Sequence, residues 1–298
     1  MEKSREAVKL GDYFYRIRTE RDIILKAASA GTPSTLARFE KGEHNLSNER
    51  LFVVMNKIGL QAEDLQNEFV RFYSPFNMVA NQISEHAMNQ TPAFLAEIIK
   101  QYESLADHEG KLYQLNHQVL DVRYQSRLVG KSILMSDQLE NDVVTLLLRN
   151  DCWVKYDYWL LYLAAPYLST AGLVRVCAHE AENRNTENAN YAPYKNGALC
   201  QVMLTFVLRG ELDQARQLKT RLVQMKMNLF WAVSTTNTTL INLISHWLDR
   251  DVPLAVKQSR SQALIETVRA LEMPSMVTYL QGLTAQLTEL AEGDGGNE

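Results

Sequence analysis

The stretch Thr32-Pro33-Ser34-Thr35-Leu36-Ala37-Arg38-Phe39-Glu40-Lys41-Gly42 predicts a short helix with two different faces. Thr32 suits an N-cap, Pro33 the first helical position, and Gly42 the left-handed residue after the last turn. Leu36 and Phe39, three residues apart, face inward. The outward residues are then Ser34, Thr35, Arg38 and Lys41. Such hydroxyls and cations suit the major groove of DNA, although a capped surface helix without that role fits the stretch equally well.

Further short helices are predicted on both sides of this stretch. Residues 4–21 carry apolar side chains at helical spacing, and residues 23–30 form a compact alanine-rich segment. Ser47 suits the N-cap of the next helix, which Gly59 ends, and another helix begins within residues 60–65. Five short helices in about 65 residues, the third polar and basic, are typical of a helix-turn-helix domain.

The run Ala37-Arg38-Phe39-Glu40-Lys41-Gly42-Glu43, followed by Leu51 and Leu65, resembles the Xre-type (phage-repressor-like) helix-turn-helix. The sequence of residues 38–43 is most similar to that of the Rgg/GadR/MutR regulators of Gram-positive bacteria. The resemblance implies that Ser34, Thr35 and Arg38 lie in the groove. It also implies a structural role for Glu40, which could pair with Arg16 or Arg18. Pro33 departs from relatives that often carry a basic residue there.

The DNA-binding residues predicted from this domain are Ser34, Thr35, Arg38, Lys41 and His44. His44 follows the helix and either contacts phosphate or is simply exposed. Residues 1–58 hold 11 Lys+Arg against 8 Asp+Glu, whereas the remainder holds 20 against 27. A mildly basic head on an acidic body indicates that DNA contact is confined to one end of the chain. Because the head is only weakly basic, we expect a homodimer to be needed for useful affinity.

At 298 residues the chain is long enough for two domains. We predict a helix-turn-helix domain over 1–66, a linker over 67–75, a helical-repeat domain over 76–291 and a flexible tail over 292–298. Pro75 is expected to break the helix in the linker. Beyond residue 76, breakers recur near 91, 130, 170, 210 and 251, in steps of 39, 40, 40 and 41 residues. A period near 40 is the length of two helices and two turns.

The fold prediction is therefore all-α. A five-helix Xre-like domain precedes a right-handed, tetratricopeptide-like α-solenoid, with an irregular helical bundle as the alternative. The clearest unit spans residues 190–225, with the turn Arg209-Gly210-Glu211. The first helix of each pair tends to line the concave side of such an array.

Candidate ligand residues follow from the repeat. Asn196 and Asn237 are 41 residues apart, so they occupy equivalent places on successive first helices. Amides in such a ladder can bind the backbone of an extended peptide, although exposure to solvent is the commoner role of a single Asn. Arg149 could bind a carboxylate, and aromatic rings could supply an amphipathic wall or simply pack in the core. The full predicted peptide-binding set is Arg149, Asn150, Trp153, Tyr194, Asn196, Phe230 and Asn237.

Several classes of protein are disfavoured. The three cysteines, Cys152, Cys177 and Cys200, fit no metal spacing and are interpreted as small buried residues of a reduced compartment. The N-terminus lacks the apolar core of a signal peptide, and the most apolar run, residues 159–168, is too short for a bilayer. His179-Glu180 does not begin a zinc-protease motif, because Asn183 stands where that motif has its second histidine. No phosphate-loop, dinucleotide-binding or nucleophile-elbow motif is present. We expect a cytoplasmic protein without a cofactor that is not an enzyme.

The functional prediction is a homodimeric transcriptional regulator that binds double-stranded DNA and no membrane. Resemblance to the Rgg family implies a groove that binds a short, mostly apolar signalling peptide, of the quorum-sensing pheromone type, imported into the cell. Two alternatives remain: a helical-repeat scaffold for a protein partner, and a repressor that needs no ligand.

Overall fold

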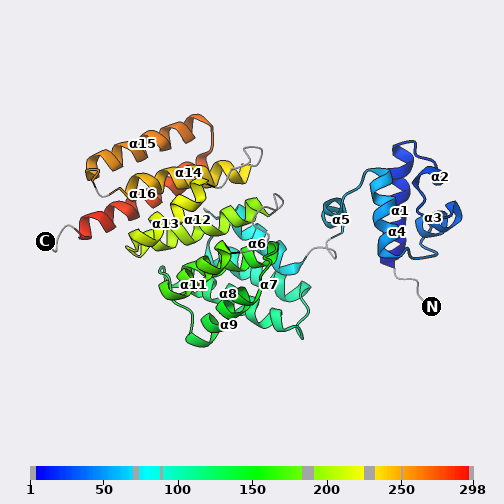
Figure 1. Cartoon of the computed structure of the whole chain (residues 1–298), viewed down its shortest axis with the longest axis horizontal. Helices are drawn as coiled ribbons and strands as arrows, with labels where there is room; N and C mark the ends of the chain where they lie inside the picture. The colour runs from blue at the N-terminus through cyan, green and yellow to red at the C-terminus, as the bar shows by residue number, and fades with distance from the viewer. Residues whose placement is uncertain are drawn as a thin grey trace. The chain divides into compact units, whose positions relative to one another are not determined.

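A computed structural model describes residues 5–69, 74–87, 90–182, 191–224, 232–249 and 251–294 (Figure 1). Helices and their connections make up these ranges, and no strand occurs within them. The chain divides into two compact units, residues 1–74 and 75–298, which we call the head and the repeat unit. The all-α prediction is therefore confirmed.

The head contains five helices: α1 (Arg5–Glu20), α2 (Leu25–Ala28), α3 (Pro33–Glu40), α4 (Asn48–Ile58) and α5 (Ala62–Glu68). The predicted caps of α3 and α4 are present. The Thr32 hydroxyl accepts from the backbone N–H of Thr35, and the Ser47 hydroxyl accepts from that of Arg50. Gly42 and Gly59, which follow α3 and α4, have φ angles of +68° and +73°. Local sequence signals thus define where α3 begins and ends.

The head has its own hydrophobic core. Leu36 and Phe39 on the inner face of α3 are 1% and 4% exposed, and the Phe39 ring packs edge-on against Phe14 of α1. Helices α1 and α3 also touch through their backbones, because Gly11 of α1 lies directly on the last turn of α3. A Cβ atom added at Gly11 would lie 2.1 Å from the carbonyl oxygen of Phe39. The packing of these two helices therefore depends on a glycine at this position.

The repeat unit alternates first and second helices of five pairs, followed by one more helix. The pairs are α6 (Pro75–Glu85) with α7 (Pro92–Leu105), α8 (Lys111–Leu128) with α9 (Asp137–Arg149), α10 (Lys155–Ala164) with α11 (Thr170–Ala181), α12 (Ala192–Leu208) with α13 (Leu212–Gln224), and α14 (Ala232–Trp247) with α15 (Leu254–Ala270); α16 (Pro274–Asp294) follows. Each predicted breaker falls in the turn inside a pair. The period near 40 residues therefore marks real helical repeats.

First helices pack on one another: α10 contacts α6, α8 and α12, and α12 contacts α14. Second helices do the same where α9 meets α11. One hydrophobic core runs through the unit, from Phe76 of α6 to Leu287 of α16. This layering of first helices over second helices is the geometry expected of a tetratricopeptide-like array.

The structure differs from the sequence-based predictions in three details. Helix α5 continues to Glu68, into the segment predicted as linker, and α16 continues to Asp294, into the segment predicted as tail. Cys152 is exposed, not buried, because it lies in the connection between α9 and α10. Cys177 is half-buried and Cys200 is buried, and burial raises the pKa of each thiol to about 12.

Candidate functional site

The outer face of α3 carries the residues that the sequence predicts to contact DNA. Ser34, Arg38 and Lys41 are exposed, as is His44 just beyond the helix, and Thr35 is half-buried. The Thr32 hydroxyl lies 3.0 Å from that of Ser34 and 2.8 Å from that of Thr35. Three hydroxyls therefore gather at the N-terminal end of α3, where backbone N–H groups favour an anion.

Arg38 is free to reach a ligand. Its guanidinium lies 3.9 Å from the carboxylate of Glu43, and the two side chains are 61% and 46% exposed. An ion pair this long and this exposed holds a side chain weakly. The arginine can therefore exchange Glu43 for a stronger acceptor, such as a guanine edge or a phosphate.

Two exposed cations beside α3 were not predicted. Lys26 lies on α2. Arg50 lies in the first turn of α4, and its guanidinium carbon is 4.0 Å from the position of a Cβ at Gly31, just before α3. The sequence does show that Arg50 lies at the start of a helix. Its proximity to α3, however, depends on how α4 packs against the earlier helices of the head.

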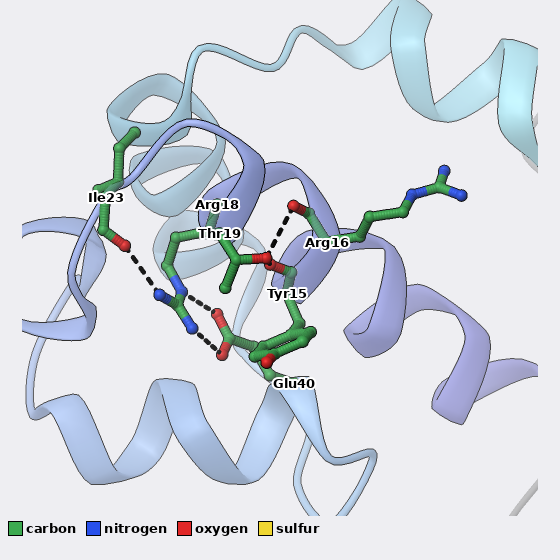
Figure 2. A network of polar contacts seen from close by, with 6 residues as sticks. All are labelled: Tyr15, Arg16, Arg18, Thr19, Ile23 and Glu40. Carbon is green, nitrogen blue, oxygen red and sulfur yellow. Dashed lines mark hydrogen bonds and ion pairs between the residues drawn. The ribbon is translucent and has the colours of Figure 1, made fainter.

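A buried ion pair holds α3 against α1 (Figure 2). Arg18 of α1 donates from Nε and Nη2 to the two carboxylate oxygens of Glu40, at 2.6 and 2.9 Å, and from Nη1 to the carbonyl oxygen of Ile23 at 2.8 Å. Arg18 and Glu40 are 7% and 8% exposed. The hydrogen bonds to Glu40 raise the pKa of Arg18 above its ordinary value. Of the two partners left open by the sequence, Arg18 is the one that pairs with Glu40.

The predicted peptide-binding residues fall into different environments. Arg149 is exposed at the end of α9. Asn150 closes the turn between α9 and α10, where its amide donates to Asp157 Oδ1 at 2.7 Å. Burial raises the pKa of Asp157 despite that bond. Phe230 lies outside the described residues, and of Asn237 only the helical backbone in α14 is described.

Trp153 is a core residue, and its prediction as part of a ligand wall was wrong. It is 0% exposed, and its indole N–H donates to the carbonyl oxygen of Leu147 at 3.1 Å. Its ring packs edge-on against Tyr158. The helical spacing of these aromatic residues was compatible with either role, and packing decides it.

Aromatic and polar groups do gather where α10 packs against α12. The rings of Trp159 and Tyr194 are 5.5 Å apart, and the Lys155 ammonium lies 4.6 Å from the Tyr194 ring centroid. Trp159 and Asn196 are the fifth residues of α10 and α12, so they occupy equivalent places in successive pairs. We call these four residues the α10–α12 wall.

Two polar atoms of the α10–α12 wall have no hydrogen-bond partner among the described residues: Trp159 Nε1 and Asn196 Oδ1. Their side chains are largely buried, with Trp159 and Asn196 7% and 5% exposed. A buried donor and a buried acceptor without partners are costly unless a bound group satisfies them. Trp159 was not among the predicted peptide-binding residues, because its helical spacing also fits the core.

Ion pairs hold the start of α12, which carries Tyr194 and Asn196. The Lys195 ammonium lies 2.8 Å from Oε1 of Glu180 in α11, and Arg221 of α13 pairs with the other oxygen at 2.6 Å. Glu180 is 0% exposed. One buried carboxylate thus ties three helices together and holds the α10–α12 wall in place.

Comparison with known proteins supports the fold. A protein from Listeria monocytogenes EGD-e assigned as a transcriptional regulator superposes with a TM-score of 0.74 over 95% of this chain and 98% of its own, at 11% identity. The SHP pheromone receptor Rgg2 of Streptococcus dysgalactiae gives 0.67 over 93% and 99%, at 11% identity. A PrgX mutant gives 0.66 over 96% and 95%, at 12% identity.

The chain has the Rgg fold. The likeness extends over both units, whereas the motif resemblance in the sequence covered only the first fifth of the chain. No family model and no curated protein sequence matches. The Rgg-like fold therefore rests on the arrangement of helices and not on overall sequence similarity.

Two classes of site are not found in the described part of the chain. No group of three or more His, Cys, Asp or Glu side chains there could hold a metal ion. None of the described helices is long and apolar enough to cross a membrane.

Proposed function

We propose that this Rgg-like chain is a DNA-binding transcriptional regulator whose repeat unit binds a short peptide, and that it acts as a homodimer. The observation that carries the DNA-binding part is the outer face of α3, where hydroxyls and an exposed, weakly held arginine lie on a helix anchored by a buried ion pair. The fold shared with a regulator and with the pheromone receptor Rgg2 supports the same reading.

In our proposal, Ser34, Thr35 and Arg38 contact base edges in the major groove. Lys41 and His44 contact phosphates, with Lys26 and Arg50 as additional phosphate contacts. A single weakly basic head makes few such contacts, so two heads on half-sites one helical turn apart supply the affinity. Hence a dimer is part of the mechanism.

Peptide binding is proposed at the α10–α12 wall. The indole N–H of Trp159 and the amide oxygen of Asn196, which have no hydrogen-bond partner in the described part of the chain, offer a donor and an acceptor to a peptide backbone, and Tyr194 and Lys155 flank them. Arg149 and Asn237 remain candidate peptide-binding residues in this proposal. Binding there shifts the population between arrangements of the dimer that hold the two heads differently.

Arg38→Ala tests the DNA-binding part. With a duplex selected by the wild-type protein from a random-sequence library, we expect affinity to fall by about 30-fold or more, since a bidentate arginine–guanine contact contributes roughly 1–3 kcal/mol and the dimer loses two of them. The unfolding midpoint should not change, because Arg38 is exposed. Fluorescence anisotropy at several salt concentrations measures the affinity and its salt dependence.

Arg175→Ala, which removes an exposed arginine from α11 of the repeat unit, is the matched control and should bind as the wild type does. Unchanged affinity of the Arg38→Ala variant would remove α3 from the interface. Wild-type binding without sequence preference would favour the scaffold alternative.

Trp159→Phe tests the peptide part, because it removes the indole N–H and keeps an aromatic ring. Native mass spectrometry of wild-type protein purified from its own host should show a dimer carrying extra mass of about a kilodalton, the size of a peptide that spans two or three repeats. We expect the bound fraction to fall strongly in the variant, since losing a buried hydrogen bond costs about 1–3 kcal/mol.

The control is Trp247→Phe, at an indole whose N–H already donates to Ser261 Oγ at 2.9 Å within the protein. That variant should lose stability and still carry the peptide. If both variants carry the same bound mass as the wild type, the α10–α12 wall is not the binding site.

A further inference from the structure

Arg123 of α8 is a buried cation without a counter-charge. Three Lys or Arg residues are buried in the described part of the chain: Arg18, Arg123 and Lys195, which are 7%, 4% and 6% exposed. Arg18 pairs with Glu40 at 2.6 Å, and Lys195 pairs with Glu180 at 2.8 Å. Arg123 forms no ion pair with any described carboxylate. Because a buried charge is costly unless it is paired, this guanidinium is suited to an anion from outside the unit.

The protein holds one side of the Arg123 guanidinium. Its Nε donates to the amide oxygen of Gln90 at 2.9 Å, and its Nη1 donates to the carbonyl oxygen of Leu163 in α10 at 3.4 Å. Gln90 is held in turn, since its Nε2 donates to the carbonyl oxygen of Ile83 at 2.9 Å. Within the described residues, Nη2 donates to no acceptor. The edge formed by Nη1 and Nη2 is the one that matches the two oxygens of a carboxylate.

Arg123 adjoins the α10–α12 wall. Its Cζ lies 6.0 Å from the ring centroid of the half-buried Tyr162, and the Tyr162 ring lies 5.6 Å from that of Trp159. Aromatic rings thus continue from Tyr194 through Trp159 and Tyr162 to the guanidinium. Leu163, which holds Arg123, comes four residues after Trp159, about 6 Å along α10. That separation is about two residues of an extended peptide.

We propose that Arg123 binds the C-terminal carboxylate of the peptide that lies on the α10–α12 wall. The inference rests on the proposed function and adds which end of the peptide is recognised. Aromatic neighbours favour apolar side chains, whereas every linear peptide carries a carboxylate at its C-terminus whatever its sequence. A site of this kind accepts a peptide that has been cut to the right end, and rejects a longer precursor whose chain continues past Arg123.

Two pools of synthetic octapeptides test the inference with the full-length protein. Both pools hold the same random sequences of Ile, Leu, Val, Phe and Gly, and one ends in free carboxylates while the other ends in carboxamides. Peptides that stay with the protein through gel filtration are released and quantified by mass spectrometry. The wild type should retain the acid pool about tenfold or more over the amide pool, because hydrogen bonds between charged groups are the stronger ones.

Arg123→Met removes the charge and keeps a long side chain, so it should retain the two pools equally. Arg123→Lys keeps the charge and should still prefer the acid pool. Tryptophan fluorescence verifies that each variant is folded. Arg123→Gln, which keeps a neutral donor for the Leu163 carbonyl oxygen, provides the same test if Arg123→Met does not fold.

Arg209→Met is the matched control. Arg209 is a half-buried arginine in the turn after α12, where its Nη2 donates to the carbonyl oxygen of Pro166 at 3.0 Å. It also lies near the carboxylates of Glu140 and Glu211, so its charge is already balanced within the protein. This variant should prefer the acid pool as the wild type does.

The remaining outcomes separate this inference from the proposed function. Equal retention of the two pools by the wild type would overturn the inference and leave peptide binding standing, and an acid preference that survives in folded Arg123→Met or Arg123→Gln would also overturn it. A third pool, of amides that each contain one Asp, tests the other source of a carboxylate. If the wild type retains that pool as well as the acid pool, the site binds an acidic side chain and the assignment to the C-terminus is wrong. If the wild type retains no pool, peptide binding fails together with this inference, and the DNA-binding proposal is unaffected.

Discussion

Gly11→Ala is expected to destabilise the head by about 1–3 kcal/mol or more. The added Cβ would lie 2.1 Å from the carbonyl oxygen of Phe39 and 2.9 Å from that of Glu40, and both belong to the backbone of α3. A backbone cannot rotate away as a side chain can, so α1 and α3 must separate. Overpacking of this kind costs about 1–3 kcal/mol and sometimes more. The free energy of unfolding of a domain of this size is roughly 4–11 kcal/mol, so the loss is a large part of it.

The two units can be followed separately. All four tryptophans, Trp153, Trp159, Trp231 and Trp247, lie in the repeat unit, so tryptophan fluorescence reports on that unit alone. Hydrogen exchange of peptides from α1 and α3 reports on the head. Gly11→Ala should raise exchange throughout the head, leave the tryptophan transition unchanged and weaken sequence-specific DNA binding.

Gly31→Ala is the matched control in the same unit. A Cβ at Gly31 has Arg50 Cζ at 4.0 Å as its near neighbour, which is ordinary contact, and the residue does not have a positive φ angle. Its exchange should match the wild type or be slower. Helix propensity alone predicts that Gly11→Ala stabilises α1 by about 0.5–1 kcal/mol. A more stable Gly11→Ala head would therefore refute the close approach of α1 and α3.

Glu40→Ala is expected to destabilise the head by about 3–5 kcal/mol, because it leaves the Arg18 guanidinium buried without its counter-charge. Arg18 and Glu40 are 7% and 8% exposed, so water cannot replace the lost carboxylate without local opening. Since Glu40 ends α3, the recognition face should also become mobile. Hydrogen exchange of the head and affinity for the selected duplex are the measurements.

A double-mutant cycle separates the pair from its parts. Arg18→Met with Glu40→Leu removes both charges and should recover much of the loss, because buried ion pairs can be replaced by apolar residues at little cost. Recovery will be incomplete, since the Ile23 carbonyl oxygen also loses the hydrogen bond from Arg18 Nη1. If the two single losses simply add in the double variant, the pair is not coupled.

The sequence alone determined what depends on neighbours along the chain. Thr32, Pro33 and Gly42 delimit α3 because capping groups act on backbone atoms within a few residues. Leu36 and Phe39 are buried because a helix turns every 3.6 residues. The repeat period followed from turns that recur near every fortieth residue. These signals were enough for the fold.

Only the tertiary structure decided which distant residues meet. Arg16 and Arg18 are equally plausible partners of Glu40 in the sequence, and the direction in which α1 crosses α3 selects Arg18. Trp153 and Trp159 share one aromatic run, yet packing satisfies the first indole and leaves the second without a hydrogen-bond partner among the residues that the structure describes. Gly11 carries no local signal, because its constraint is the backbone of another helix. Side-chain spacing encodes a face of a helix, but what lies against that face depends on contacts between residues far apart in the chain.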